Sequence, residues 1–338
     1  MAEEILRIED LSITYQSRHH RVHAVNNANM NITKGDCYGL VGESGCGKST
    51  IAKSIMGGID ENGEIESGKI IYKGEEIQDY SEKQFREQIR WKEISMIPQS
   101  PMTSLNPIER LSDQAWEIGK AHTDWDKKYT HQKFKDSFDI VGLPMERIHD
   151  YPFEFSGGMQ QRVLIALSIF LEPSLVIADE PTTALDVILQ DQIFQHLEKI
   201  REERDLSILM ITHDISIVFE NSQSVGVMHG GQIVETGDPS TIYHDARHPY
   251  SILLQRSFPD IQNTNKELVT IGGVPPKLET QVNECTFVNR CPWAINGCEN
   301  GAPKLKQSGD VNSHKVACIR KDEIPKLKEE YLKEIDNK

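Results

Sequence analysis

The stretch from Gly42 to Thr50 restricts the possible fold more than any other part of this sequence. It reads Gly-Glu-Ser-Gly-Cys-Gly-Lys-Ser-Thr and fits the pattern G-x-x-x-x-G-K-[ST]. The apolar run Tyr38–Val41 before it predicts a buried strand, and residues 51–56 after it predict the start of a helix. Strand, glycine-rich loop and helix in this order predict a phosphate loop, and a glycine-rich turn that binds nothing is the weaker alternative.

A phosphate loop binds anions through its backbone. Its glycines let successive amide N–H groups converge on phosphate oxygens, and the following helix adds the partial positive charge of its N-terminus. Lys48 would reach the β- and γ-phosphates, and the Ser49 hydroxyl would ligate Mg²⁺. The residues predicted to bind nucleotide here are Gly42, Glu43, Ser44, Gly45, Cys46, Gly47, Lys48, Ser49 and Thr50.

Length and charge narrow the class of protein. The chain has 338 residues, and at about 150 residues per domain this suggests one large domain and an appendage. Its net charge of −15 argues against a surface that neutralises nucleic-acid phosphates. No apolar run approaches the roughly 20 residues of a membrane-spanning helix, and Met1–Asp10 is too acidic for a signal peptide. We therefore expect a cytoplasmic protein.

Two candidate residues lie at the ends of predicted strands. Tyr15 ends an alternating strand over residues 5–15, where its ring would stack on adenine or serve as an ordinary strand tyrosine. Gln99 follows the strand 93–97 and a proline that cannot continue a central strand. Its amide would reach Mg²⁺ or an attacking water, although a glutamine after a strand is a weak signal by itself. Apolar spacing then predicts helices over 106–152, inserted between strands of the core.

Further candidates follow this helical insertion. Residues 156–158, Ser-Gly-Gly, open a predicted helix whose unpaired N–H groups form a second anion site, with an ordinary capped helix as the alternative. The strand 175–180 ends in Asp179 and Glu180, and carboxylates are costly to bury unless a cation or a proton transfer uses them. Asp179 suits a water-mediated Mg²⁺ contact, and Glu180 suits a general base.

One histidine and four cysteines complete the set of candidates. His213 follows the strand 207–211, at the carboxyl edge where open α/β sheets bind ligands, although a lone histidine there is more often structural. The four late cysteines are Cys285, Cys291, Cys298 and Cys318. Cytosolic thiols rarely form stable disulfides, so we expect this group to bind a metal. The final segment 323–338 fits a short amphipathic helix or a solvated terminus.

Together these motifs resemble the ATP-binding-cassette (ABC) ATPases. The matching segments are Walker A at Gly42–Thr50, the Q-loop residue Gln99, the signature Ser156-Gly157-Gly158-Met159-Gln160, the Walker B residues Asp179 and Glu180, the D-loop Ala184-Leu185-Asp186 and the switch residue His213. The resemblance implies an α/β P-loop fold, with a RecA-like core, an antiparallel β subdomain and a helical insertion. It also implies a head-to-tail dimer, in which the signature of one cassette caps the ATP γ-phosphate held by the other.

The resemblance also implies a role for each residue. ATP would be bound by Tyr15, the phosphate loop, Ser156, Gly157, Gly158, Gln160 and Asp186. Catalysis would use Glu180 as base, His213 against the γ-phosphate and Gln99, and Mg²⁺ would be held by Ser49, Gln99 and Asp179. ATP would close the dimer and hydrolysis would reopen it. Cys46 stands where the family often has serine and is most simply a small buried residue.

Other segments resemble the dipeptide, oligopeptide and nickel importer branch of this family. They are Ser100–Pro107, Ala178–Asp186, His248-Pro249-Tyr250, Gly273–Pro276 and the spacing Cys285-x5-Cys291-x6-Cys298-x19-Cys318. In that branch the four cysteines are implied to hold a 4Fe-4S cluster, for which four thiolates are the usual ligands. Structural Zn²⁺ is the alternative, although this spacing lacks the short knuckle of most zinc sites. Thiols without metal are the third possibility.

We therefore predict an ABC ATPase domain over residues 1–257, with a helical subdomain at about 100–160, and a Cys-rich C-terminal extension over 258–338. The chain would couple ATP hydrolysis to the import of dipeptides or oligopeptides, with nickel or oligosaccharides as other cargo. Its expected partners are two transmembrane permease subunits, a second and different ABC ATPase subunit and an external solute-binding protein. A soluble ABC ATPase acting on nucleic acid or ribosomes is the competing class, which the acidic balance disfavours.

Overall fold

The computed structural model describes residues 3–18, 20–99, 104–182, 187–258, 269–279, 283–309 and 313–336. The chain forms two compact units, each assembled from segments that are distant in sequence. The helical unit contains residues 1–5, 33–37 and 79–211, and the loop unit contains residues 6–32, 38–78 and 212–338. Within the described ranges, no helix is long and apolar enough to span a membrane.

Three parallel strands form the sheet of the helical unit. They are β6 (Ile94–Ile97), β7 (Leu175–Asp179) and β8 (Ser207–Thr212), in the order β6-β7-β8. Ile94 lies opposite Leu175, which in turn lies opposite Ser207. All five residues of β7 are buried, which is typical of a parallel strand covered on both faces and explains its continuous apolar run.

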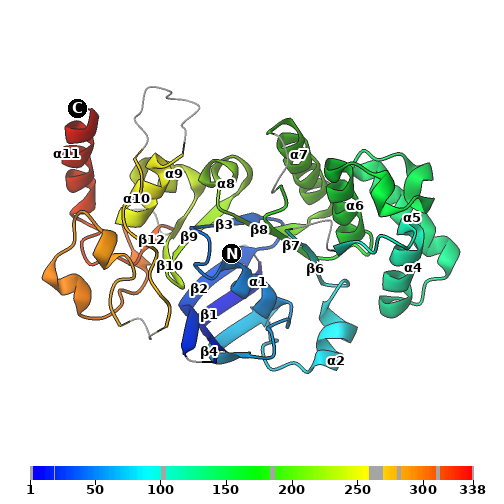
Figure 1. The fold of residues 1–338 in the computed structure, drawn as a ribbon, viewed down its shortest axis with the longest axis horizontal. Coiled ribbons are helices and arrows are strands. Elements are labelled where there is room, and N and C mark those ends of the chain that lie inside the picture. Colours follow the sequence, from blue (N-terminus) through cyan, green and yellow to red (C-terminus); the bar gives the residue numbers. More distant parts are fainter. Residues whose placement is uncertain are drawn as a thin grey trace. The chain divides into compact units, whose positions relative to one another are not determined.

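The predicted helical insertion is confirmed. Between β6 and β7 lie α4 (Leu111–His122), α5 (Lys127–Ile140), η2 (Met145–His149), η3 (Pro152–Glu154) and α6 (Gly157–Ile169). Figure 1 shows α4, α5 and α6 gathered in one bundle. The rings of Phe134, Phe138 and Phe170 are fully buried in it, and the Asp126 carboxylate accepts the Tyr129 N–H at the start of α5.

The other elements of the helical unit are α2 (Glu82–Gln84), the π-helical turn η1 (Phe85–Ile89) and α7 (Val187–Arg204). The 18-residue α7 was not predicted from the sequence. Its apolar residues recur with weak helical periodicity, so the pattern did not separate it from the turn before it, although Asp186 is a residue type favoured before a helix.

An antiparallel sheet makes up the first part of the loop unit. Its strands are β1 (Glu4–Gln16), β2 (Arg21–Thr33), β4 (Gly63–Tyr72) and β5 (Glu75–Glu76), in the order β2-β1-β4-β5. A bulge in β1 places Asp10 at φ 43, and Gly68 of β4 lies beside it at φ 93. A Cβ on Gly68 would lie 2.5 Å from the Asp10 carbonyl oxygen, so only glycine fits this close approach.

The strand that leads into the phosphate loop belongs to a second set of strands in this unit. It consists of β3 (Cys37–Val41), β9 (Ser224–His229), β10 (Gln232–Gly237), β12 (Lys315–Val316) and β11 (Lys306–Gln307). β3 pairs with β9 in parallel, and β9, β10, β12 and β11 continue antiparallel. Gly230 and Gly231 both have positive φ and form the hairpin turn between β9 and β10.

Helices of the loop unit pack against these strands. They are α1 (Lys48–Ile55), α8 (Ile215–Asn221), α9 (Pro239–Asp245), α10 (Pro249–Arg256), η4 (Val288–Arg290), η5 (Asn296–Glu299) and α11 (Ile324–Asp336). The buried core around Val41, Val225 and Tyr250 also includes Phe287. A smaller cluster joins Trp293 to Ile324 of α11. The late part of the chain is therefore packed onto the core of this unit.

Two segments of the loop unit differ from what their local sequence suggests. The first half of β4, which begins at Gly63, is a partly exposed, polar strand with little apolar signal. Residues 239–256 are helical but are divided into α9 and α10. Pro249 begins α10 and disfavours helical backbone at His248 before it.

Candidate functional site

The glycines of the phosphate loop are required by packing. Gly47, the N-cap of α1, has φ 109, and a Cβ there would lie 2.3 Å from the Ala24 carbonyl oxygen. A Cβ on Gly42 would lie 2.1 Å from the Met228 carbonyl oxygen. The Gly231 N–H donates to the Cys46 carbonyl oxygen at 3.0 Å. The loop is thus held against the β9–β10 hairpin by backbone contacts that a side chain would block.

Lys48 lies inside the curve of the loop. Its side chain is buried, and Nζ donates to the carbonyl oxygens of Gly42 at 2.8 Å and Glu43 at 3.0 Å. No side chain caps the N-terminus of α1, and Ser44, Gly45 and Ser49 are exposed. An ammonium, a helix N-terminus and exposed loop residues lie in one place, and together they have the chemistry that a phosphate-bearing ligand requires.

Cys46 is a buried thiol beside the Lys48 ammonium. Burial raises the pKa of this thiol, and the positive charge of Lys48, with Nζ at 3.7 Å from Sγ, acts in the opposite direction. The thiol is therefore protonated at neutral pH and serves as a small packing residue.

Glu43 is anchored by residues far along the chain. Both of its carboxylate oxygens accept bonds from the Arg290 guanidinium, each at 2.7 Å, and this pair lowers the pKa of Glu43. The Tyr250 hydroxyl accepts the Glu43 N–H at 2.8 Å. Neither anchor was predicted from the sequence. Tyr250 belongs to the segment His248-Pro249-Tyr250 that resembles the importer branch, but the resemblance assigns it no role.

The Walker B carboxylates and the Q-loop glutamine come together in the helical unit. Asp179 ends β7 as a buried residue. Glu180 follows at φ 48, a conformation that strains a glutamate, and its N–H donates to the Ile211 carbonyl oxygen at 2.8 Å. The Gln99 amide Nε2 donates to Glu180 Oε2 at 2.7 Å. Two of the three residues predicted to be catalytic therefore contact each other directly.

The signature segment of the helical unit is presented to solvent. Ser156 is the N-cap of α6 and is exposed together with Gly157, and a Cβ on Gly157 would meet no atom within 4 Å. Gly158 is buried against Leu189 of α7. The Gln160 amide donates to the carbonyl oxygens of Pro152 and Phe155. These contacts hold the first turn of α6 in place and leave Ser156 and Gly157 exposed to solvent.

The remaining ATP-site candidates are placed as follows. Tyr15 is half-buried, and its ring covers Gly63 on the neighbouring strand β4, with a ring carbon 2.6 Å from where a Cβ of that glycine would be. His213 directly follows β8 and is exposed. Thr50 is half-buried in the first turn of α1. The D-loop residues 184–186, including Asp186, lie outside the described residues, as do residues 100–103 after the Q-loop.

The four late cysteines line one pocket in the loop unit. Other lining residues include His248, Phe287 and Trp293. The Cys285 N–H donates to the Cys298 carbonyl oxygen at 3.0 Å. Burial raises the pKa of the Cys291 thiol to about 11 and that of Cys318 to about 12, and it also raises the pKa of Cys285. Among the residues that the structure describes, no three His, Cys, Asp or Glu side chains are grouped closely enough to hold a metal ion.

His248, one of the residues that line this pocket, has a buried polar ring. Its Nδ1 accepts the Tyr250 N–H at 3.1 Å, so the neutral ring carries its proton on Nε2. That Nε2 is buried with no hydrogen-bond partner in the described part of the chain. Burial lowers the pKa of His248 to about 3, so the ring is neutral. A buried N–H without a partner is costly, and an electron-rich sulfur in the pocket would satisfy it.

Comparisons with known proteins extend over almost the whole chain. A family model described as "ABC transporter" matches residues 25–183, and one described as "Oligopeptide/dipeptide transporter, C-terminal region" matches residues 234–298. The chain is 38% identical over 313 residues to the dipeptide transport ATP-binding protein DppD of Escherichia coli (strain K12), covering 92% of this chain and 95% of DppD. It is 40% identical over 304 residues to the oligopeptide transport ATP-binding protein OppD of Salmonella typhimurium, covering 89% and 90% of the two chains.

Solved structures of ABC proteins share the fold of this chain. The dimeric ATP-binding cassette MJ0796, in a post-hydrolysis state bound to ADP and Pi, superposes with a TM-score of 0.63 at 23% identity and covers 70% of this chain and 99% of its own. The cbiO1 protein of Clostridium perfringens, part of the ABC transporter complex cbiONQ, gives a TM-score of 0.61 at 27% identity, with coverage of 71% and 91%. The likeness to MJ0796 shows a shared fold.

Proposed function

The chain belongs to the ABC transporter ATPases of the oligopeptide and dipeptide transporter branch, and on this premise we propose that it hydrolyses ATP to drive the uptake of dipeptides or oligopeptides. The observation that carries the proposal is the 38% identity to DppD over 92% of the chain. The loop geometry agrees with it, because Lys48 and the N-terminus of α1 form a phosphate site. Nickel or an oligosaccharide is the alternative cargo.

In this proposal the phosphates are bound by the residues of the loop. Gly42 to Thr50 would surround them with N–H groups, and Lys48 would move from the loop carbonyls to the β- and γ-phosphate oxygens. Tyr15 would stack on adenine. Ser49, Gln99 and Asp179 would hold Mg²⁺, which when bound neutralises charge that develops on the phosphates.

Glu180 is the proposed general base. Its carboxylate would take a proton from a water whose oxygen attacks the γ-phosphorus, while the bond from that phosphorus to the β,γ-bridging oxygen breaks and ADP leaves. The Gln99 amide holds Glu180 Oε2 at 2.7 Å and orients the carboxylate. His213 would donate to a γ-phosphate oxygen as negative charge increases there.

The proposed site is completed by a second cassette. Ser156 and Gly157 are exposed on the helical unit, which suits a role across a dimer, where they would cap a γ-phosphate held by a partner ATPase subunit. Gly158, Gln160 and Asp186 would belong to the same interface. The partner is expected to be a related but different chain.

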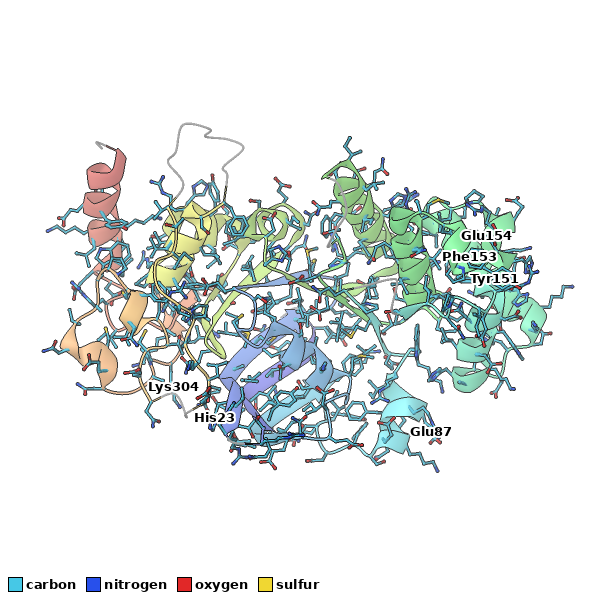
Figure 2. All side chains as sticks on the ribbon, viewed as in Figure 1. His23, Glu87, Tyr151, Phe153, Glu154 and Lys304 are labelled. Atoms are coloured by element: carbon cyan, nitrogen blue, oxygen red, sulfur yellow. The ribbon has the colours of Figure 1, made fainter. Side chains whose placement is uncertain are left out.

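The helical region is the proposed contact with the membrane subunits. Ile108 and Phe153 are 82% and 68% exposed. Figure 2 shows Phe153 beside Tyr151, and their rings stack with centroids 5.5 Å apart. The exposed Phe153 ring and its stacked neighbour Tyr151 suit a role in an interaction surface. The chain would bind two transmembrane permease subunits from the cytoplasmic face of the membrane, with an external solute-binding protein that delivers the cargo.

We propose an ABC ATPase domain over residues 1–257, with its helical subdomain at about 100–160, and a Cys-rich extension over 258–338. Cys285, Cys291, Cys298 and Cys318 would hold a 4Fe-4S cluster, which when bound supplies a covalent link between distant segments and a one-electron centre. The four thiols line one pocket, but no three of the described side chains are grouped closely enough to hold a metal, so binding of a cluster would have to draw the thiols together. Zn²⁺ is the alternative, and iron, sulfide and zinc analysis of anaerobically purified protein separates the two.

Transport in vesicles tests the proposed function. The chain, co-purified with its permease subunits and partner ATPase, is reconstituted with a solute-binding protein outside, and uptake of a labelled dipeptide is measured with MgATP. We expect ATP-dependent uptake that a Glu180→Gln variant abolishes. Uptake of nickel or an oligosaccharide instead of peptide would correct the cargo, and co-purification with ribosomes or nucleic acid in place of permeases would overturn the importer assignment.

A further inference from the structure

We propose that Arg290 and Tyr250 position the phosphate loop, and that through these two residues the cysteine pocket is coupled to nucleotide binding. The proposal goes beyond the transport function and depends neither on the cargo nor on which metal the cysteines bind. All of the residues involved lie in the loop unit. The connection runs from the pocket wall to Glu43, and from Glu43 to Lys48.

Arg290 forms the first connection. Nη1 and Nη2 each donate to one carboxylate oxygen of Glu43 at 2.7 Å, and Nε donates to the Gly272 carbonyl oxygen at 2.9 Å. Its side chain is only 5% exposed, and its guanidinium lies 5.6 Å from the centre of the Phe287 ring. A planar fork held in this way fixes the carboxylate in both position and orientation, which the single point charge of a lysine cannot do.

Tyr250 forms the second connection. Its hydroxyl accepts the Glu43 N–H at 2.8 Å, and its buried ring packs on His229 with centroids 4.4 Å apart. Glu43 is therefore held at both its side chain and its backbone. The Glu43 carbonyl oxygen in turn accepts a bond from Lys48 at 3.0 Å. A shift of Glu43 would therefore move one of the carbonyl oxygens that hold Lys48, the lysine proposed to bind phosphate.

Both connections begin at the wall of the cysteine pocket. Cys291 follows Arg290 directly, and His248 begins the turn of helix that carries Tyr250. Phe287 also lines the pocket and contacts the Tyr250 ring, with centroids 5.4 Å apart. The two anchors of the loop therefore belong to two of the segments that form the wall of the pocket. A change that rearranges the pocket changes the anchoring of Glu43, and by linkage nucleotide binding changes the pocket equally.

Nucleotide affinity of the purified protein tests the positioning role. Arg290→Gln and Glu43→Gln should each weaken MgATP binding about tenfold, because each removes a charge-assisted pair. Arg290→Lys should recover only part of the loss, and the double variant should bind no more weakly than either single variant. Arg247→Gln is the matched control, since Arg247 pairs with Asp245 at 2.7 Å and is 18% exposed without contacting the loop. Glu43→Gln keeps the test decisive if Arg290 variants fail to fold.

Hydrogen exchange tests the coupling without measuring activity. In the wild-type protein, MgATP should slow amide exchange over residues 285–292, and in Arg290→Gln this protection should be lost even at saturating MgATP. Equal protection in the two proteins, or an unchanged affinity in Glu43→Gln, would overturn the proposal. If the wild-type protein failed to bind MgATP, the ATPase assignment itself would fail, so the two failures are distinguishable.

Discussion

The phosphate loop and the cysteine pocket are built in opposite ways. Nine consecutive residues form the loop, and its geometry follows from glycines, a lysine and a helix N-terminus that are adjacent in sequence. The pocket is assembled from His248, from residues 285–298 and from Cys318 to Ile324, which meet only in the fold. A contiguous site tolerates almost no substitution at its own positions. A distributed site shares its stability among many contacts, so single changes there should have smaller effects.

The largest expected effect is a loss of ATP turnover. It concerns Glu180, a residue of the helical unit that belongs to neither the phosphate loop nor the cysteine pocket. Glu180→Gln should lower ATP hydrolysis by about 10²–10⁴-fold, because an amide cannot take the proton of the attacking water. ATP affinity should stay near wild type, and the closed dimer should accumulate. Phosphate release and nucleotide binding measure the two effects. Glu172→Gln, at an exposed glutamate that pairs with Lys133, is the control. Normal turnover by Glu180→Gln would place the base elsewhere.

In the contiguous site, Lys48→Ala should weaken ATP binding by about a hundredfold or more, since each charge-assisted bond contributes about 1.5–3 kcal/mol. Fluorescence titration with a labelled nucleotide measures the change. Lys53→Ala is the matched control on the same helix, because Lys53 pairs with the exposed Asp60. Unchanged affinity in Lys48→Ala would contradict the assignment of the loop.

Acid should lower the stability of the folded chain through His229, whose ring packs against Tyr250 and Phe287. Burial lowers the pKa of His229 from 6.5 to about 4, so the folded chain binds fewer protons than the unfolded chain between these pH values. The free energy of unfolding should therefore fall as the pH drops from 6.5 to 4, by roughly 2 to 3 kcal/mol from this residue. Denaturant titrations at several pH values measure it. A His229→Gln variant with the same pH dependence as wild type would show that other groups cause the loss.

The smallest expected effect comes from the distributed site. Cys298→Ser should lower the metal content per chain and, through the proposed coupling, weaken MgATP binding by about fivefold, at the low end of typical coupling between sites. Metal analysis and nucleotide titration on the same preparation measure both. Cys37→Ser, at a buried thiol outside the pocket, is the control. A loss of metal with unchanged nucleotide affinity would leave the two regions independent.

The difference between the two regions also explains what the sequence could predict. The parallel strands and the helical insertion follow from local patterns and are confirmed, whereas α7 was not predicted. Of the two alternatives for the last segment, the structure has the helix, α11. The contact between Gln99 and Glu180 was within reach, because both follow parallel strands of one sheet. Arg290 and Tyr250 were not, since an arginine before a cysteine and a tyrosine after a proline carry no local sign of a partner more than two hundred residues away.

The bonds of Lys48 to the carbonyl oxygens of Gly42 and Glu43 have a thermodynamic consequence. In the proposed binding of ATP, its phosphates would have to compete with these two carbonyl oxygens for the lysine. The contribution of Lys48 to the affinity would then be the difference between its bonds to phosphate and its bonds to the loop. The loss of affinity in Lys48→Ala would therefore understate the strength of the bonds that this lysine makes to phosphate.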